Sequence, residues 1–361
     1  MKVLGTLLIV VLLAMAAGAA FLWLGLYRPY GIIPAQGVFV EIPRGSSQRA
    51  AAHLLKSKGI IRSAIAFEIY ARRHPKRSLL AGEYFFDHPV SGKDAYWKIA
   101  NGEIYQRLFT VHEGDTMYDI ANNLGAAGYM QAADFLAAAK NASQIQDIAP
   151  GAKSLEGFLF PATYDVPLHA GAPDLTTTMV RKFRDALQQI APDRLDPQIP
   201  GTPLLSVITL ASLVEAETPK PEERPLVAGV YTNRLRKGML LQCDPTVIYA
   251  LKQVLAYNHP LTFKDLRYDS AYNTYVHTGL PPGPIGNPGE SSIRAALSPA
   301  ATGYLYFVAN TQGGHFFAAT LAEHQLNVAK YHRLLNGEPG DPPEPVQQES
   351  RAAAAARKGK S

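Results

Sequence analysis

Two acidic residues, Glu215 and Glu217, end an apolar stretch of the chain that reads ITLASLVEAE. The stretch is predicted to be a buried helix, and Pro219 and Pro221 stop it just after the second acid. An ionised carboxylate beside a core costs several kcal/mol unless it is paired or its pKa rises. The pattern therefore indicates that the chain uses one of these acids for proton transfer.

The two acids lie on different sides of the predicted helix, since a separation of two residues is a rotation of roughly 200°. Glu215 shares an apolar strip with Ile208 and Ala211, whereas Glu217 shares a strip with Ser206. The spacing predicts that Glu215 is the more buried acid and that the two cannot form a facing pair. By pattern alone, either one can also be a satisfied acid at a helix end.

Other reaction classes lack their motifs. The sequence has no GxxxxGK[ST] loop, no GxGxxG after a strand and no GxSxG elbow. Its ten histidines are scattered without HExxH, and its single cysteine, Cys243, cannot form an intramolecular disulfide or a multi-cysteine metal site. The net charge of +5 is not gathered into a basic stripe. We expect no metal, no cofactor and no nucleic-acid partner.

The acid-bearing helix belongs to a region of mixed helices and strands. A loop rich in proline and glycine, TGLPPGPIGNPG at 278–289, cannot be regular structure. After the last predicted strand, at 304–310, a turn and a final helix complete the region. Its predicted elements are helices at about 174–191, 203–217, 226–235 and 244–252, and a strand at 304–310.

A related pattern of strand, turn and helix occurs twice nearer the N-terminus. Residues 38–61 are predicted to be a strand, a turn and a helix capped by Ser46 or Ser47, and residues 107–124 repeat this order around Gly114. The second copy, in a unit at about 107–150, resembles a LysM module, a small βααβ unit that binds glycans containing N-acetylglucosamine. Turn chemistry alone can also explain the Gly-Asp-Thr sequence.

The first residues are predicted to be a membrane anchor. From Val3 to Tyr27 there is no charge, and 25 residues exceed the roughly 30 Å of a bilayer's hydrocarbon core at about 1.5 Å per residue. The small residues of AMAAGAA would suit a signal peptidase, but the apolar run continues well beyond a signal peptide's usual length. Lys2 and Arg28 flank the run and barely discriminate its orientation.

Several blocks of the sequence together resemble the YceG-like, or MltG-type, endolytic murein transglycosylases. The blocks are GEYFF, LEGFLFPATY, SLVEAET, ERPLVAGVYTNRLRKGMLLQCDPTVIYAL, AYNTYVHTGLPPGPIGNPG and YLYFVANTQGGHFFAATLAEH, in the family's order behind an N-terminal anchor. The resemblance covers nearly everything up to about residue 335. It departs from the family at Cys243, where the usual block has threonine.

The resemblance implies that Glu217, the second acid of the pair, is the catalytic residue. A lytic transglycosylase needs one acid/base, which protonates the oxygen between N-acetylmuramic acid and N-acetylglucosamine and then deprotonates the muramoyl C6 hydroxyl. That hydroxyl closes a 1,6-anhydro ring. The remaining motif residues are expected to form a substrate groove: Asn233, Gln242, Asp244, Tyr272, Asn273, Tyr275 and His315.

Two other functions stay open at this point. One is a non-catalytic, glycan-binding membrane scaffold. The other is a muramidase-type hydrolase, in which water is the nucleophile and Asp244 or Glu223 is the second carboxylate.

The predicted fold class is α+β, with an N-terminal transmembrane helix, a LysM-like membrane-proximal domain and a mixed α/β YceG-like catalytic domain. We expect a cytoplasmic N-terminus and anchor at 1–30, a membrane-proximal region at 31–150, the catalytic domain at 151–336 and a disordered tail at 337–361. The resemblance implies single-pass insertion in the bacterial inner membrane, with the catalytic domain on the periplasmic side. It also implies that the chain acts on nascent peptidoglycan strands beside the peptidoglycan synthases.

Overall fold

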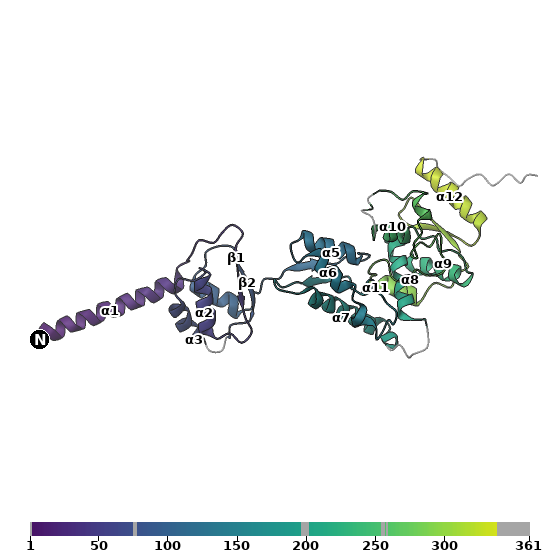
Figure 1. Ribbon diagram of the computed structural model, residues 1–361. Helices are drawn as coiled ribbons and strands as arrows, with labels where there is room; N and C mark the ends of the chain where they lie inside the picture. Colours follow the sequence, from purple (N-terminus) through teal and green to yellow (C-terminus); the bar gives the residue numbers. More distant parts are fainter. Residues whose placement is uncertain (1, 75–77, 196–201, 254–256, 258, 338–361) are drawn as a thin grey trace, which may run out of the picture. The chain divides into compact units, whose positions relative to one another are not determined.

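The computed structural model describes residues 2–74, 78–195, 202–253, 257 and 259–337 (Figure 1). The predicted tail, apart from Gly337, lies outside the described residues. The chain forms two compact units, one made of residues 1–108 and 165–169, the other of residues 109–164 and 170–361. This division differs from the predicted boundary at 150.

The first unit packs helices on one face of a two-stranded sheet. Antiparallel strands β1 and β2 pair Val38 with Phe86 and Ile42 with Gly82. The alternation predicted for 38–42 is confirmed, because Val40 and Ile42 are buried while Glu41 is exposed. The elements of this unit are α1 (Lys2–Tyr27), β1 (Val38–Ile42), α2 (Gln48–Ser57), α3 (Ala64–Arg72), β2 (Gly82–Phe86) and α4 (Gly92–Ala100).

Serine caps start the three short helices of this unit. The side chains of Ser47, Ser63 and Ser91 each accept a hydrogen bond from the backbone N–H three residues later, at 3.1, 3.2 and 3.1 Å. Each cap satisfies one of the free N–H groups of a helix's first turn. The sequence prediction of a serine cap at 46 or 47 is therefore confirmed at Ser47.

Helix α1 joins the first unit through its last turn. The stretch Thr6–Tyr27 is long and apolar enough to cross a membrane, with a mean hydropathy of 2.7. A Cβ atom built on Gly25 would lie 3.0 Å from the Cβ of Ser63 and 3.1 Å from the Cβ of Ala66. Glycine at 25 therefore lets α1 pack closely against α3, while most of the preceding apolar helix is exposed.

The second unit is mostly helical. Helix α8 lies against α9, α10 and α11, and α12 packs on the hairpin of β5 and β6 (Figure 1). Its helices are α5 (Met117–Ala126), α6 (Ala132–Ala139), α7 (Ala172–Ile190), α8 (Leu204–Glu217), α9 (Arg224–Arg236), α10 (Asp244–Lys252), α11 (Glu290–Leu297) and α12 (Leu321–Leu335). Its strands are β3 (Leu108–Thr110), β4 (Thr163–Asp165), β5 (Tyr306–Ala309) and β6 (His315–Ala318), and its 3₁₀ turns are η1 (Ala142–Ile145), η2 (Pro192–Leu195) and η3 (Asp265–Arg267).

A buried carboxylate explains why residues 109–164 belong to this larger unit. Glu156 is 2% exposed and accepts hydrogen bonds from the N–H of Met117 at 3.0 Å, the hydroxyl of Tyr249 at 3.0 Å and the amide of Asn287 at 3.1 Å. These donors belong to α5, to α10 and to the proline-glycine loop 278–289. Because they converge on one carboxyl group, these three parts form one core, which extends across the predicted boundary at 150.

The region predicted to be LysM-like has the expected order of strand, helix, helix and strand. Its second strand is β4, which pairs with β3 and lies beyond the predicted limit of 150. The turn at Gly114 is bonded within the chain, since Gly114 donates to the carbonyl of Asn287 at 2.8 Å and Asn287 donates to the carbonyl of Asp115 at 3.0 Å. The backbone groups of this turn, on which the glycan-binding prediction was based, are thus hydrogen-bonded to the proline-glycine loop of the same unit.

Replacing Gly25 by leucine tests the junction of α1 with α3. We expect Gly25→Leu to destabilise the first unit by about 1–3 kcal/mol, because the added side chain would meet Ser63 and Ala66. Gly18→Leu is the matched control, since a Cβ there meets nothing within 4 Å. Melting temperatures in detergent would check this, and equal melting of both variants would show that the close packing is unimportant.

Candidate active site

Helix α8 carries both candidate acids at its C-terminal end. Every residue from Val207 to Val214 is buried, so the helix is surrounded on all sides before it reaches Glu215. The helix ends at Glu217, because Thr218 takes an extended backbone and prolines follow at 219 and 221. This arrangement holds the carboxyl of Glu217 at the margin of the core.

Glu217 is hydrogen-bonded to two donors from neighbouring elements. The hydroxyl of Tyr231, on α9, donates to Oε1 of Glu217 at 2.5 Å. The thiol of Cys243, directly before α10, is the second group that stabilises the ionised form of Glu217. Tyr231 is 1% exposed and Cys243 fully buried. These donors fix the position of the acid without supplying a positive charge.

Burial raises the pKa of Glu217 above its usual range. The hydrogen bonds from Tyr231 and Cys243 oppose that rise, the charge of Asp244 adds to it, and His315 opposes it. Burial also raises the pKa of both Tyr231 and Cys243 well above their usual values, so both stay protonated and continue to donate. A carboxyl with a raised pKa in a partly desolvated place is suited to general acid catalysis near neutral pH.

Glu215 has a different environment. Its Oε1 lies 2.7 Å from Nη2 of Arg224, its Oε2 accepts the backbone N–H of Gly289 at 2.9 Å, and its side chain is 6% exposed. Arg224 also lies 3.4 Å from Glu113. The acid thus connects α8 to α9 and to the end of the proline-glycine loop, which agrees with the expectation that it satisfies nearby donors.

Four of the predicted groove residues have surfaces that a ligand can reach. Gln242 and Asp244 are exposed, and Tyr275 donates its hydroxyl to Oδ1 of Asp244 at 2.5 Å. Tyr272 is half-buried, with its ring 5.0 Å from that of Tyr249. Asp244 acts electrostatically on Glu217, which places it beside the acid.

His315 is held by Glu223 near the acid. Oε2 of Glu223 lies 2.7 Å from Nδ1 of His315, and Oε1 accepts the backbone N–H of the same residue at 3.0 Å. Burial opposes ionisation of Glu223, but its bonds to His315 outweigh this and hold the pKa of Glu223 below its usual value. Both oxygens of Glu223 are therefore engaged with His315.

The two asparagines predicted to bind sugar hydroxyls are used inside the protein. Asn273 is fully buried, donates to the carbonyls of Leu266 and Tyr268 at 3.0 and 2.7 Å, and accepts the N–H of Tyr275 at 2.9 Å. In this structure the side chain of Asn273 thus fixes the segments that carry Leu266, Tyr268 and Tyr275.

Asn233 is similarly occupied. Its amide donates to the carbonyls of Thr302 and Tyr304 at 2.7 and 2.9 Å, so both amide hydrogens hold the segment that leads into β5. Those donors are unavailable to a sugar. As with Asn273, the amide of Asn233 joins parts of the chain that are distant in sequence, and this structural role accounts for an asparagine at the position.

Sequence reasoning missed three residues that organise the site: Tyr231, Arg234 and Glu156. Arg234 is 8% exposed and donates to the carbonyls of Leu305 and Leu241 at 2.6 and 2.9 Å. Glu156 lies in the apolar block LEGFLF. An acidic residue within an apolar run is the same sequence signal that indicated a functional role for Glu217. Burial raises the pKa of Glu156 to about 8, opposed by the hydrogen bonds that it accepts.

The described residues contain no group of three or more histidine, cysteine, aspartate or glutamate side chains placed to hold a metal ion.

Comparison with known proteins places this geometry in a family. The model of the YceG-like family matches residues 40–330. The chain belongs to the YceG-like family. It is 33% identical over 333 residues to the endolytic murein transglycosylase of Bacillus subtilis, covering 87% of this chain and 90% of that protein.

Further relatives agree with this membership. The endolytic murein transglycosylase of Streptococcus pneumoniae is 30% identical over 324 residues, and the match spans 81% of this YceG-like chain but 58% of that longer protein. A crystal structure of a YceG-like protein from Listeria monocytogenes is similar with a TM-score of 0.52 and 34% identity. That similarity covers 81% of this chain and 99% of the other.

Replacing Glu215 by glutamine tests its structural role. We expect Glu215→Gln to lower stability by roughly 1–3 kcal/mol, because Arg224 loses a buried charged partner. Glu290→Gln is the control, since its pair with Arg294 is about half exposed and is expected to contribute under about 1 kcal/mol. Chemical denaturation of both variants would check this; equal small losses would contradict the assignment.

Replacing Tyr231 by phenylalanine should change the pH profile of the enzyme. The Tyr231 hydroxyl stabilises ionised Glu217, so its removal raises the pKa of Glu217 further. A hydrogen bond to a charged group contributes about 1.5–3 kcal/mol, or roughly one to two pH units. The fall of kcat on the alkaline side should therefore move to higher pH.

The matched control for this variant is Tyr331→Phe on α12, which should leave the profile unchanged. An alkaline limb that stays in place in Tyr231→Phe, or moves to lower pH, would show that Tyr231 does not stabilise the ionised form of the acid.

Proposed function

We propose that this YceG-like chain is an endolytic murein lytic transglycosylase with Glu217 as its acid/base. The observation that carries the proposal is the carboxyl of Glu217 at the end of α8, where Tyr231 holds it and burial raises its pKa, whereas the neighbouring Glu215 is paired with Arg224. The relatives named endolytic murein transglycosylase supply the substrate class. The bond to be cleaved is the β-1,4 bond between N-acetylmuramic acid and N-acetylglucosamine of a glycan strand.

The chemistry requires one carboxyl group in two protonation states. Protonated Glu217 donates to the glycosidic oxygen, and the bond from that oxygen to C1 of the muramoyl sugar breaks. The resulting carboxylate then takes the proton of the C6 hydroxyl, whose oxygen attacks C1 and closes the 1,6-anhydro ring. The proton count balances, and Glu217 returns to its protonated state without water being consumed.

The groove residues orient the substrate in this proposal. Tyr272 and Tyr275 offer partly exposed rings for sugar faces, while Gln242, Asp244 and His315 offer hydrogen-bonding groups. Action within nascent strands would place the enzyme beside peptidoglycan synthases and would end glycan elongation.

Asp244 keeps a hydrolytic route chemically available, since it is an exposed carboxylate beside Glu217. Glu223 is less suited to that role because His315 engages both of its oxygens. The two routes differ in their product, because an anhydro end is lighter by one water than a hydrolysed end.

Mass spectrometry of the products tests the reaction and its acid together. Glycan strands treated with the chain should yield anhydro-muramoyl ends, and Glu217→Gln should lower turnover by roughly 10²–10⁴-fold while keeping its melting temperature. Asp244→Asn should retain anhydro product, since only the hydrolase needs that carboxylate. Products with a reducing end would refute the transglycosylase, and an active Glu217→Gln would refute the acid.

We further propose that α1 is retained as a single-pass anchor, with the catalytic unit outside the cytoplasm where murein is assembled. Thr6–Leu24, at about 1.5 Å per residue, is roughly as long as a bilayer core is thick, and the next residue, Gly25, already packs on α3. The protein should stay with membranes after carbonate washing and keep its first residues. A mature N-terminus near Ala20 would contradict this.

A further inference from the structure

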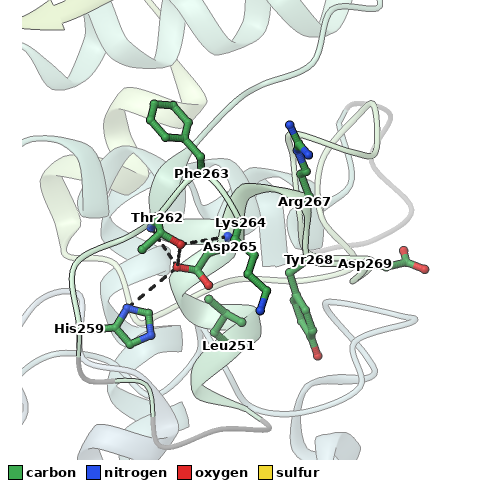
Figure 2. Close-up of a pocket in the computed structure, with 9 residues that line it drawn as sticks. All are labelled: Leu251, His259, Thr262, Phe263, Lys264, Asp265, Arg267, Tyr268 and Asp269. Atoms are coloured by element: carbon green, nitrogen blue, oxygen red, sulfur yellow. Dashed lines mark hydrogen bonds and ion pairs between the residues drawn. The ribbon is translucent and has the colours of Figure 1, made fainter.

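A second concave site of about 810 Å³ lies at the end of α10 opposite to Asp244. It is formed by Leu251 and by the segment 259–269, called here the basic-aromatic pocket (Figure 2). From residue 244 to residue 251 the helix rises by roughly 10 Å. The proposed chemistry at Glu217 makes no use of this pocket.

Hydrogen bonds within the chain fix the pocket's wall. The carboxylate of Asp265 accepts the N–H and the hydroxyl of Thr262 at 2.9 and 2.6 Å, and these bonds hold the pKa of Asp265 below its usual range. Asn273 ties the carbonyls of Leu266 and Tyr268 to the segment that carries Tyr272 and Tyr275. The wall is thus built onto the substrate groove.

The pocket and Asp244 share helix α10, since Leu251 lines the pocket and Asp244 begins the helix. The hydroxyl of Tyr257 is buried without a hydrogen-bond partner among the described residues. Both Asp265, in the pocket, and Asp244, beside Glu217, act on that hydroxyl. Because Asp244 and Leu251 lie near the two ends of α10, a ligand that follows this helix from Asp244 reaches the pocket.

The pocket is lined by two cations, Lys264 and Arg267, and by two carboxylates, Asp265 and Asp269, each of which has a histidine partner. Lys264 and Arg267 are exposed, and in the described part of the chain neither has a carboxylate within ion-pair distance. Asp265 is engaged by Thr262 and by His259, whose Nδ1 lies 4.0 Å away. Lysine and arginine bind carboxylates and phosphates through charge-assisted hydrogen bonds.

The arrangement of these side chains favours an extended ligand with more than one carboxylate. In Figure 2, Arg267 and Phe263 extend to one side of the segment, and Lys264 and Tyr268 extend to the other. Phe263 is 88% exposed and offers an apolar surface at the rim. A single small anion would engage one cation, whereas a short peptide with several carboxylates and apolar side chains can engage both.

We propose that the basic-aromatic pocket binds the peptide stem of the murein strand through the stem's carboxylates. The inference rests on the proposed function, because the glycan in the groove delivers the attached peptide. Three to five peptide residues span roughly 10–17 Å, which matches the separation of the pocket from Asp244 along α10. The pocket thereby makes the enzyme favour strands that still carry their peptides.

The test compares glycan strands that bear stems with the same strands after enzymatic removal of the stems. In Lys264→Ala/Arg267→Ala, the KM for stem-bearing strands should rise roughly tenfold or more, the effect of losing a charged hydrogen bond. The KM for bare strands and both kcat values should be unchanged. The matched control, Arg181→Ala/Lys182→Ala, removes two exposed cations from α7 and should behave as wild type.

A titration with the free stem peptide gives a second readout that does not depend on catalysis. Wild type should bind it, and Lys264→Ala/Arg267→Ala should bind it at least roughly tenfold more weakly. Equal loss of activity on both kinds of strand, or unchanged peptide binding, would overturn the proposal. If wild type cleaved neither strand, the proposed function would fail, and the titration would still decide the role of the pocket.

Discussion

The contact between Glu217 and Tyr231 is the interaction on which the site depends. A carboxyl group can serve as acid and then as base only if its two protonation states lie close in free energy near the working pH. Burial at the end of α8 destabilises the ionised form, and the hydroxyl of Tyr231 with the thiol of Cys243 recovers part of that loss. Neither donor brings a positive charge, which would hold the acid permanently ionised. The residues of α8 from Val207 to Val214 are all buried, so the helix that carries this group is enclosed by the core.

Other buried charges hold the elements around that helix. Glu215 joins α8 to Arg224 and to Gly289, and Glu156 joins α5, α10 and Asn287. A buried carboxylate is tolerated only where donors surround it, so each network specifies the relative placement of three segments. This explains why the region before residue 150 folds together with the catalytic helices. It also explains why the proline-glycine loop, which has no regular structure, still has a defined position.

Much of the local structure could be predicted from the sequence. The apolar periodicity gave α8, α9 and α10 nearly to the residue, and a serine cap gave the start of α2. Strand β6 was missed because its four residues, HFFA, follow a turn and precede a strong helix signal, and it becomes a strand by pairing with β5. Asn233 and Asn273 were predicted to bind sugar because a polar residue in a motif has the same appearance whether its partner is a ligand or a distant carbonyl.

The sequence by itself determined the helices α8, α9 and α10, that an apolar helix precedes the first unit, and that an acid stands at the end of a buried helix. These features depend on neighbours along the chain, so periodicity, caps and prolines are enough to define them. The tertiary structure alone decided that Tyr231 and Cys243 meet Glu217, that Arg224 meets Glu215, and that the first compact unit ends at residue 108. Hydrogen bonds and burial between residues far apart in the sequence leave no periodic signal, because their geometry exists only once the core has closed.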